Sequence, residues 1–261
     1  MKTRTVLLGV GLVALSMACA AAPQYSARYS EVVPKLDGVA ESVWDKVAWS
    51  APFVLGKEAG ASKTAPTRFK ALYTTEAIYF YVECTEPHPE KIFDEFQPHE
   101  FWLCDVVEIY ASAFKEDSVH LILSAHGNRN EEISGMTAKR TRSHIEWFGK
   151  SKIAADRWSC EFRLPLVLLG AAPVDGAAQV KLNLSRNTTT TSPKEYTSWR
   201  YVEGGFASDN GAGTLVLEKA PAAVAAKLRE AVDPLKLPEP EAVRAERERV
   251  SRIRKTLFGE D

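Results

Sequence analysis

Two glutamates could together perform acid–base chemistry: Glu108 in the phrase DVVEIY and Glu161 in the phrase WSCEF. Glycoside hydrolases use such a carboxylate pair, with one group protonating the leaving oxygen and the other attacking or activating water. Both glutamates lie on the polar phase of alternating stretches, where a charged side chain faces solvent or an ion-pair partner. We therefore interpret both as structural charges. The sequence has no nucleophile elbow, phosphate-binding loop, dinucleotide fingerprint or HExxH motif, so we favour a non-catalytic role and leave enzymatic activity open.

Sugar binding is a second chemistry open to this sequence. It needs flat aromatic rings against the C–H face of a pyranose, with amide, guanidinium or carboxylate groups reaching the hydroxyls. Three of the six tryptophans lie in loop-like or strand-end settings and are candidates for stacking: Trp102, Trp147 and Trp199. The other three have apolar neighbours and are expected in the core: Trp44, Trp49 and Trp158.

Metal binding is the third chemistry, and it centres on the acidic segment of residues 83–108. Calcium takes six to eight oxygen ligands, which clustered carboxylates can supply. The weak candidates are Glu86, Asp94 and Asp105. The segment lacks the spacing of an EF-hand loop, and a solvated acidic loop explains its charges equally well. His88 and His99 are interpreted as solvent-exposed histidines in preference to metal ligands.

Short alternating stretches must position these residues. They span residues 68–73, 78–84, 106–111, 120–124, 158–164, 180–185 and 214–217. Period-2 alternation is typical of half-buried strands, and turn signals separate the stretches. No long helical period occurs before residue 220, so a parallel sheet with crossover helices is excluded. The sequence predicts an all-β fold, an antiparallel β-sandwich with a short C-terminal helical extension.

Five phrases occur in an order that resembles the family 9 carbohydrate-binding modules and the wider DOMON-like group of β-sandwiches. They are LDGVAESVWDKVAW at residues 36–49, ALYTTEAIYFYVECTE at 71–86, DVVEIY at 105–110, RWSCEFRLPLVLLG at 157–170 and GTLVLE at 213–218. The resemblance implies a jelly-roll sandwich that lies outside the cytoplasm and binds sugars without cutting them. It also implies structural calcium, and so it strengthens the expectation that the acidic segment of residues 83–108 binds calcium.

The resemblance also suggests site residues. In the family two aromatic side chains sandwich the sugar, and polar residues on adjoining strands bond its hydroxyls. The stretch KLNLSRNTTTTSPKEYTSW is similar to the family's polar and stacking stretch, which implies roles for Asn183, Arg186 and Trp199. The chain departs from the family where GGFASDNGAGTLVL replaces a loop containing His-Pro. Related DOMON domains hold haem, but Met136 is the only methionine well inside the mature chain, so haem is not expected.

The first twenty residues predict export. Lys2 and Arg4 precede a short apolar run at residues 6–15, and Ala18-Cys19-Ala20 resembles a signal-peptidase site. The apolar run is too short to span a membrane. An alternative is a lipoprotein with a lipidated Cys19. The mature chain then keeps three scattered cysteines, Cys84, Cys104 and Cys160; two of them could pair, but the three make neither a disulfide framework nor a zinc site. Cys84 and Cys160 lie on the apolar phase of predicted strands, so we interpret these two as small buried side chains.

The expected organisation is a signal peptide at 1–20, a polar lead-in at 21–35, the β-sandwich at 36–220 and a helical tail at 221–261. The tail combines an Ala-rich helix at 222–232 with a charged amphipathic helix at 241–258, which packs on the sandwich or docks a protein partner. A formal net charge of −1 gives no case for nucleic acid. We expect a periplasmic or extracellular carbohydrate-binding protein; the alternatives are a glycan-degrading hydrolase component or an envelope interaction protein that has lost sugar binding.

Overall fold

The computed structural model describes most of the region predicted as a sandwich. The described residues are 23–55, 66–93, 100–112, 118–134, 147–170, 172–190, 194–201 and 212–233, with single positions at 249, 252 and 255; the side chains of 102 and 132–134 lie outside the description. The predicted signal peptide and most of the predicted helix at 241–258 fall outside these ranges. Within the described residues, no helix is long and apolar enough to span a membrane.

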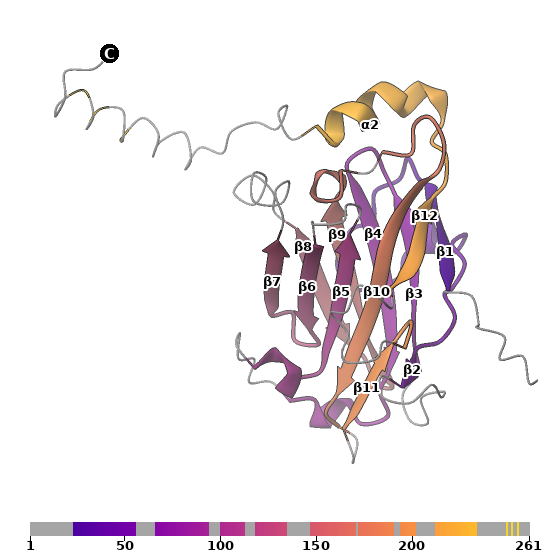
Figure 1. The fold of residues 1–261 in the computed structure, drawn as a ribbon. Helices are drawn as coiled ribbons and strands as arrows, with labels where there is room; N and C mark the ends of the chain where they lie inside the picture. The colour runs from indigo at the N-terminus through magenta and orange to yellow at the C-terminus, as the bar shows by residue number, and fades with distance from the viewer. Residues whose placement is uncertain are drawn as a thin grey trace, which may run out of the picture.

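Two layers of strands make up the fold (Figure 1). The first, sheet A, runs in the order β7 (Arg129–Ser134), β6 (Ser118–Ser124), β5 (Val106–Ser112), β10 (Ala178–Thr188), β12 (Gly213–Leu217) and β1 (Gln24–Tyr29). Sheet B continues from β1 through β3 (Thr67–Tyr73), β4 (Ala77–Thr85) and β9 (Arg157–Pro165) to β8 (Phe148–Ile153). Strand β11 (Glu195–Ser198) pairs with β10 and with the short β2 (Val54–Leu55). The predicted all-β fold is confirmed.

Strand β1 joins the two sheets and makes them nearly closed, so that the sandwich is barrel-like. Its residues 24–27 pair with β12 and its residues 28–29 pair with β3, parallel in both cases. The other strand pairs are antiparallel, as the sequence predicts. Strand β1 lies in the segment predicted as a polar lead-in. The alternation in QYSARY turns Tyr25 and Ala27 into the core and leaves the polar residues outside.

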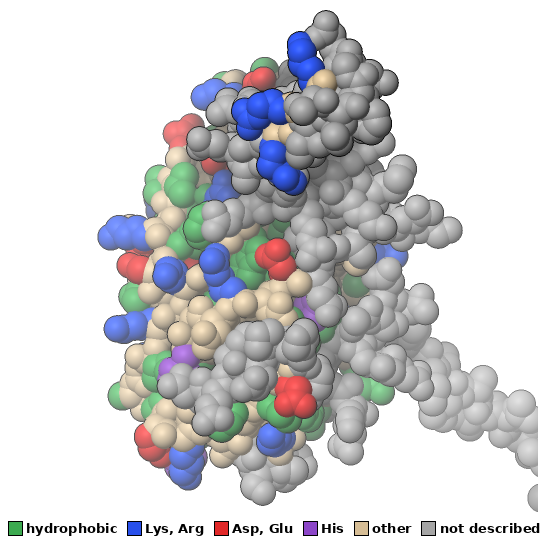
Figure 2. All heavy atoms as spheres, turned by 90° about the vertical axis from the view of Figure 1, so that its left-hand side faces the viewer, with side chains coloured by type: hydrophobic (Ala, Val, Ile, Leu, Met, Phe, Trp, Pro, Cys, Tyr) green, Lys and Arg blue, Asp and Glu red, His purple; other side chains and the backbone are tan. Residues whose placement is uncertain are grey.

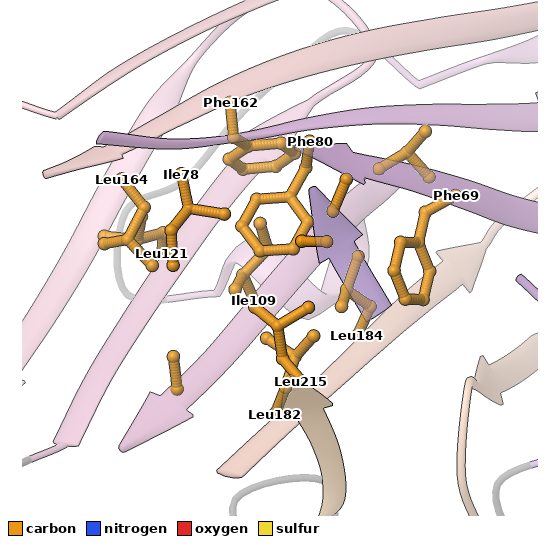
Figure 3. Close-up of a cluster of buried hydrophobic side chains, with 14 of the residues drawn as sticks. Phe69, Ile78, Phe80, Ile109, Leu121, Phe162, Leu164, Leu182, Leu184 and Leu215 are labelled. Atoms are coloured by element: carbon orange, nitrogen blue, oxygen red, sulfur yellow. The ribbon is translucent and has the colours of Figure 1, made fainter. Parts of the chain in front are cut away.

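The main core lies between the two sheets. Figure 3 shows Phe69, Phe80 and Phe162 of sheet B pointing toward aliphatic side chains of sheet A such as Ile109 and Leu184. These residues alternate with outward-facing ones along each strand, which is the two-residue period of a β-strand. Parts of the outer faces are also buried, in one smaller apolar group around Trp44 and another around Cys104. Trp44 and Trp158 are fully buried, as predicted, whereas Trp49 is only partly buried. Truncating one such aromatic to Ala costs about 3–5 kcal/mol.

Short helices lie in the connections between the strands and after the last strand. The 3-10 helices are η1 (Ser42–Trp44), η2 (Pro89–Lys91), η3 (Phe101–Leu103), η4 (Leu166–Leu168) and η6 (Ala222–Val224). The last of these leads into α2 (Ala225–Ala231), which confirms the Ala-rich helix expected at 222–232. Leu228 of α2 is fully buried in the main core and anchors this helix to the sandwich. Of the second expected helix, only positions 249, 252 and 255 are described, and they are helical.

The two cysteines predicted to be buried, Cys84 and Cys160, are buried, and Cys104 is buried as well. Desolvation raises the pKa of the Cys84 thiol to about 12 and raises that of Cys160 well above its ordinary value. Thiols that stay protonated at neutral pH are poor nucleophiles and poor metal ligands, so these two act as small apolar side chains.

Candidate functional site

The outer face of sheet A concentrates polar side chains on three neighbouring strands. Inward residues such as Ile109 on β5 and Leu184 on β10 fix the phase, so the residues between them point outward. Glu108 lies opposite Ser185 on β10, and Tyr110 lies between Asn183 on β10 and His120 on β6. We call the following set the outer-face cluster: Glu108, Tyr110, His120, Asn183, Ser185 and Asn187.

Glu108 is the centre of this cluster and is nearly fully buried, with a side chain 3% exposed. Its Oε2 accepts a hydrogen bond from the Tyr110 hydroxyl at 2.7 Å and lies 2.8 Å from His120 Nε2. The rings of Tyr110 and His120 are stacked, with centroids 4.1 Å apart and planes 18° from parallel. One carboxylate oxygen is therefore held by two aromatic side chains, which fixes the orientation of the group.

On β10, some polar atoms of the cluster are hydrogen-bonded within the protein and others have no partner among the described residues. Asn183 is already engaged: its Nδ2 donates to the carbonyl of Arg200 at 3.2 Å, and its Oδ1 accepts from the Arg200 N–H at 3.1 Å. Ser185 Oγ and Asn187 Oδ1 are buried and have no hydrogen-bond partner among the described residues. An unpaired buried polar group costs about 1–3 kcal/mol. Such atoms are well suited to bonding a hydroxyl-rich ligand.

An aromatic segment borders the cluster. Helix η3 directly precedes β5 and carries Phe101, Trp102 and Leu103. The Phe101 ring lies edge-on to His120, with centroids 5.7 Å apart, and packs on a small apolar group that includes Ile122. Leu103 remains 38% exposed. The backbone therefore places Trp102 next to a residue that contacts the cluster, although its side chain lies outside the description.

The structure places the other two candidate tryptophans in the interior. Trp147 is 3% exposed, and its ring is stacked on Phe162 with centroids 5.9 Å apart. Trp199 is 4% exposed and meets Phe69 edge-on at 5.2 Å. It also lies so close to Gly213 that a Cβ there would sit 2.5 Å from the indole. In this structure neither ring is presented to solvent, and stacking by them remains a prediction.

Arg186 also points inward, because it shares the phase of Leu182 and Leu184 on β10. Its guanidinium donates to Glu86 at 3.0 Å and to the carbonyl of Thr85 at 2.8 Å, and both charged side chains are 0% exposed. Arg186 and Asn183 therefore lie on opposite faces of β10, so the structure does not bring them together in one site.

The calcium candidates differ in what the structure shows of them. Glu86 is bonded by Arg186 and by the Thr190 hydroxyl at 2.8 Å, and Asp105 is bonded by Thr189. Desolvation raises the pKa of Asp105, which disfavours the charged form that a cation needs. Asp94 lies outside the described residues, which contain no group of three or more His, Cys, Asp or Glu side chains arranged to hold a metal ion.

Glu161 lies on sheet B and is fully buried, whereas the sequence suggested a side chain that faces solvent or an ion-pair partner. Its Oε1 accepts from Trp44 Nε1 at 2.9 Å, and its Oε2 accepts from the main-chain N–H groups of Asp37 and Gly38, each at 2.9 Å. Gly38 has a φ of +80°, and a Cβ there would meet the Ser151 main chain at 2.8 Å. Glu161 thus anchors a tight loop. Since Glu108 projects from the outer face of the other sheet, the two carboxylates do not flank one substrate.

The sequence analysis missed Tyr110, His120, Ser185 and Asn187 as site residues. All four lie on the polar phase of their strands, which was a readable signal. The order of β6, β5 and β10 across the sheet could not be predicted, because β10 is far from β5 in sequence.

Elsewhere on the surface, around β7, acidic and basic side chains are interspersed over the described residues (Figure 2).

Comparison with known proteins gives a likeness of fold only. No family model and no curated protein sequence matches this chain. A family 9 carbohydrate-binding module from Caldicellulosiruptor kristjanssonii, in complex with cellotriose, matches with a TM-score of 0.58 and 17% identity over 76% of this chain and 95% of that one. A family 9 module from the same organism, in complex with glucose, gives 0.55 and 17% over 76% and 97%. A candidate carbohydrate-binding protein from Bacteroides uniformis gives 0.56 and 14% over 76% and 100%. The fold of this chain therefore resembles that of the family 9 carbohydrate-binding modules.

Proposed function

We propose that this protein is a carbohydrate-binding protein without catalytic activity and that the sugar contacts the outer-face cluster of sheet A. The observation that carries the proposal is Ser185 Oγ, a buried hydroxyl without a partner among the described residues, which lies opposite the oriented carboxylate of Glu108. The fold supports the same conclusion, because similar modules were solved with cellotriose and with glucose.

The chemistry of the cluster suits a sugar. A carboxylate accepts hydrogen bonds from hydroxyl groups, a serine hydroxyl both donates and accepts, and an asparagine amide does the same with two atoms. Glu108, Ser185 and Asn187 provide these three kinds of group on adjacent strands. Trp102 would supply the stacking ring beside them, and Asn183 would act indirectly by fixing the main chain at Arg200.

The non-catalytic part of the proposal is supported by the separation of Glu108 and Glu161 on the outer faces of different sheets. Each carboxylate is bonded by protein donors. We also propose that the protein is exported, on the basis of the charged and apolar pattern in residues 2–20.

Calorimetric titration of the full chain with cellotriose tests the proposal, with glucose as the shorter ligand. Ser185→Ala and Glu108→Gln should each weaken binding by about tenfold, which corresponds to about 1.4 kcal/mol. Ser159→Ala on sheet B is the matched control and should leave affinity unchanged. Unaltered affinity in both outer-face variants, with their folds intact, would show that the sugar does not use this cluster.

A further inference from the structure

Strand β1 has one edge that is only partly paired. Its residues 24–27 run beside β12, whereas only Arg28 and Tyr29 run beside β3. Toward its start, β1 therefore has a neighbour on the β12 side but no strand on the β3 side. This seam between the sheets lies away from β5 and β6, on the right-hand side of the molecule in Figure 1.

The direction of each peptide group on β1 follows from two printed hydrogen bonds. The Thr214 N–H donates to the carbonyl of Pro23 at 3.0 Å, and the Glu218 N–H donates to the carbonyl of Ala27 at 2.9 Å. Alternate residues of a strand in a parallel ladder bond to the same neighbour. Pro23, Tyr25 and Ala27 therefore face β12, and the peptide groups of Gln24 and Ser26 face the other way, where none of the described residues bonds to them.

A buried tyrosine keeps the two strands apart at this place. The Tyr25 hydroxyl accepts the N–H of Ala71 on β3 at 3.0 Å and donates to the carbonyl of Ala48 at 2.6 Å. Ala71 thus bonds to a side chain where it could have bonded to the edge of β1. Burial raises the pKa of Tyr25 to about 12, so the hydroxyl keeps its proton and its donor role at neutral pH.

The space between the start of β1 and β3 opens into a groove of about 740 Å³. That volume lies in the range of ordinary ligand sites, about 300–1,000 Å³. Gln24 and Ser26 lie along the groove, and its walls carry Val43, Val47 and Trp49 from the segment around η1 together with Leu72 from β3. Val32, which also lines it, is 60% exposed. An open strand edge is therefore bordered by apolar side chains.

We propose that this groove binds an extended peptide segment of a partner protein, which adds to β1 as a strand. The free N–H and C=O groups of Gln24 and Ser26 repeat every second residue, about 6.6 Å apart, which matches the alternate peptide groups of a strand. A sugar chain has no such repeat of paired donors and acceptors. Alternate apolar side chains of the peptide pack against Val47, Trp49 and Leu72.

The charged side chains at the groove indicate that the partner peptide carries an acidic residue. Arg28 at the groove is paired with Glu218 at 3.4 Å, whereas Lys46 on the opposite wall has no ion pair among the described residues. An acidic side chain at one end of the peptide complements Lys46. This inference does not depend on sugar binding, because the groove and the outer-face cluster lie on different strands of the sandwich.

Amide hydrogen exchange on the full chain, followed by NMR, gives the first test. In the free protein the amides of Gln24 and Ser26 should exchange at least about tenfold faster than those of Tyr25 and Ala27, which bond to β12. Equal protection of all four amides would mean that the edge is already paired within the chain, and it would overturn the proposal.

The second test uses the peptide acetyl-Glu-Val-Thr-Val-Thr-Val-amide and two versions of it that are N-methylated on alternate residues. The parent peptide should bind with a Kd of about 1 mM or tighter and should slow exchange at Gln24 and Ser26. Only every second N–H of an added strand faces β1, so one methylated version should lose binding and the other should keep it. Failure of the parent peptide to protect Gln24 and Ser26, or equal behaviour of the two methylated versions, would contradict strand addition.

Ser26→Pro is the protein variant that isolates the main chain, because it removes the N–H that faces the groove at an edge where proline is tolerated. It should weaken peptide binding at least about tenfold, whereas Ser26→Ala, which keeps the peptide group, should bind like the wild type. Lys46→Gln should weaken binding by a few-fold. Cellotriose affinity should be unchanged in all three variants, so a failure of this inference is distinguishable from a failure of the proposed sugar site.

Discussion

Glu108 on β5 and Ser185 on β10 lie directly opposite each other on the outer face of sheet A. One is a buried carboxylate held through a single oxygen by Tyr110 and His120, and the other is a buried hydroxyl without a partner among the described residues. This pair sets the centre of the proposed sugar site. Other buried polar residues, among them Arg186, Glu86 and Asp105, are bonded within the protein and lead to predictions about stability.

Breaking the Arg186–Glu86 ion pair should strongly destabilise the protein. Both side chains are fully buried, and removal of one partner leaves the other charge uncompensated, at a cost of about 3–5 kcal/mol. Glu86→Ala should therefore lower the unfolding free energy by that amount in urea denaturation. The exposed pair Arg229–Asp175 is the matched control, and Asp175→Ala should change stability by less than about 1 kcal/mol. A mild effect of Glu86→Ala would mean that the pair is not buried in solution.

A methyl group at position 213 should disturb the packing of Trp199. A Cβ on Gly213 would lie 2.5 Å from the indole ring and 2.9 Å from the carbonyl oxygen of Pro23. Overpacking of this kind typically costs about 1–3 kcal/mol. Gly176→Ala is the control, because nothing lies within 4 Å of a Cβ at that position. Equal thermal stability of the two variants would contradict the placement of Trp199 against β12.

The buried carboxyl of Asp105 should make the stability of the folded protein depend on pH. Burial raises the pKa of this carboxyl in the folded state, with the Thr189 hydrogen bond acting in the opposite direction. The folded protein therefore holds this proton more tightly than the unfolded chain. Its stabilising contribution is fully present below the ordinary carboxyl pKa and is lost as the pH rises through the raised value.

Urea unfolding between about pH 4 and about pH 7 tests this contribution. Asp105→Asn, which keeps an acceptor for Thr189, should show a smaller loss of stability with rising pH than the wild type. A loss of the same size in both proteins would assign the effect to other groups.

The strands and much of the core were predictable because they depend on local alternation. The inward phase of Phe80, Val82 and Cys84 is visible in the sequence, and so are the apolar neighbours of Trp158. The inward direction of Arg186 was also present as a signal, since it follows Leu182 and Leu184 at even spacing. The pairing of Arg186 with Glu86 was not predictable, because Glu86 follows β4 and lies far from β10 in sequence.

The site and the groove depend on relationships that a single sequence does not contain. The neighbour order of β5 and β10 brings Glu108 beside Ser185, and only the three-dimensional pairing shows this. Strand-end position did not reveal whether Trp147 and Trp199 face inward or outward. Strand β1 was not predicted because it has only six residues and most of them are polar. Its pairing with both sheets is visible only in the structure.

Trp102 offers a test of stacking beside the cluster. Its backbone lies between Phe101, which contacts His120, and the exposed Leu103. Trp102→Ala should weaken cellotriose binding by about tenfold if its ring stacks on the sugar, because such contacts are worth about 0.5–1.5 kcal/mol beyond their buried area. Thermal unfolding serves as the control. A weakened affinity that only accompanies unfolding, or full affinity in a stable variant, would remove Trp102 from the site.

Sugar binding on the outer face of sheet A is tested most directly by an NMR titration of the isotope-labelled full chain with cellotriose. We predict saturable chemical-shift changes that are largest at Glu108, Tyr110, His120 and Ser185, with the amides of Gln24 and Ser26 in the β1 groove unaffected and no release of glucose over the experiment. Shift changes confined to any other surface, or none at saturating cellotriose, would contradict sugar binding on the outer face of sheet A.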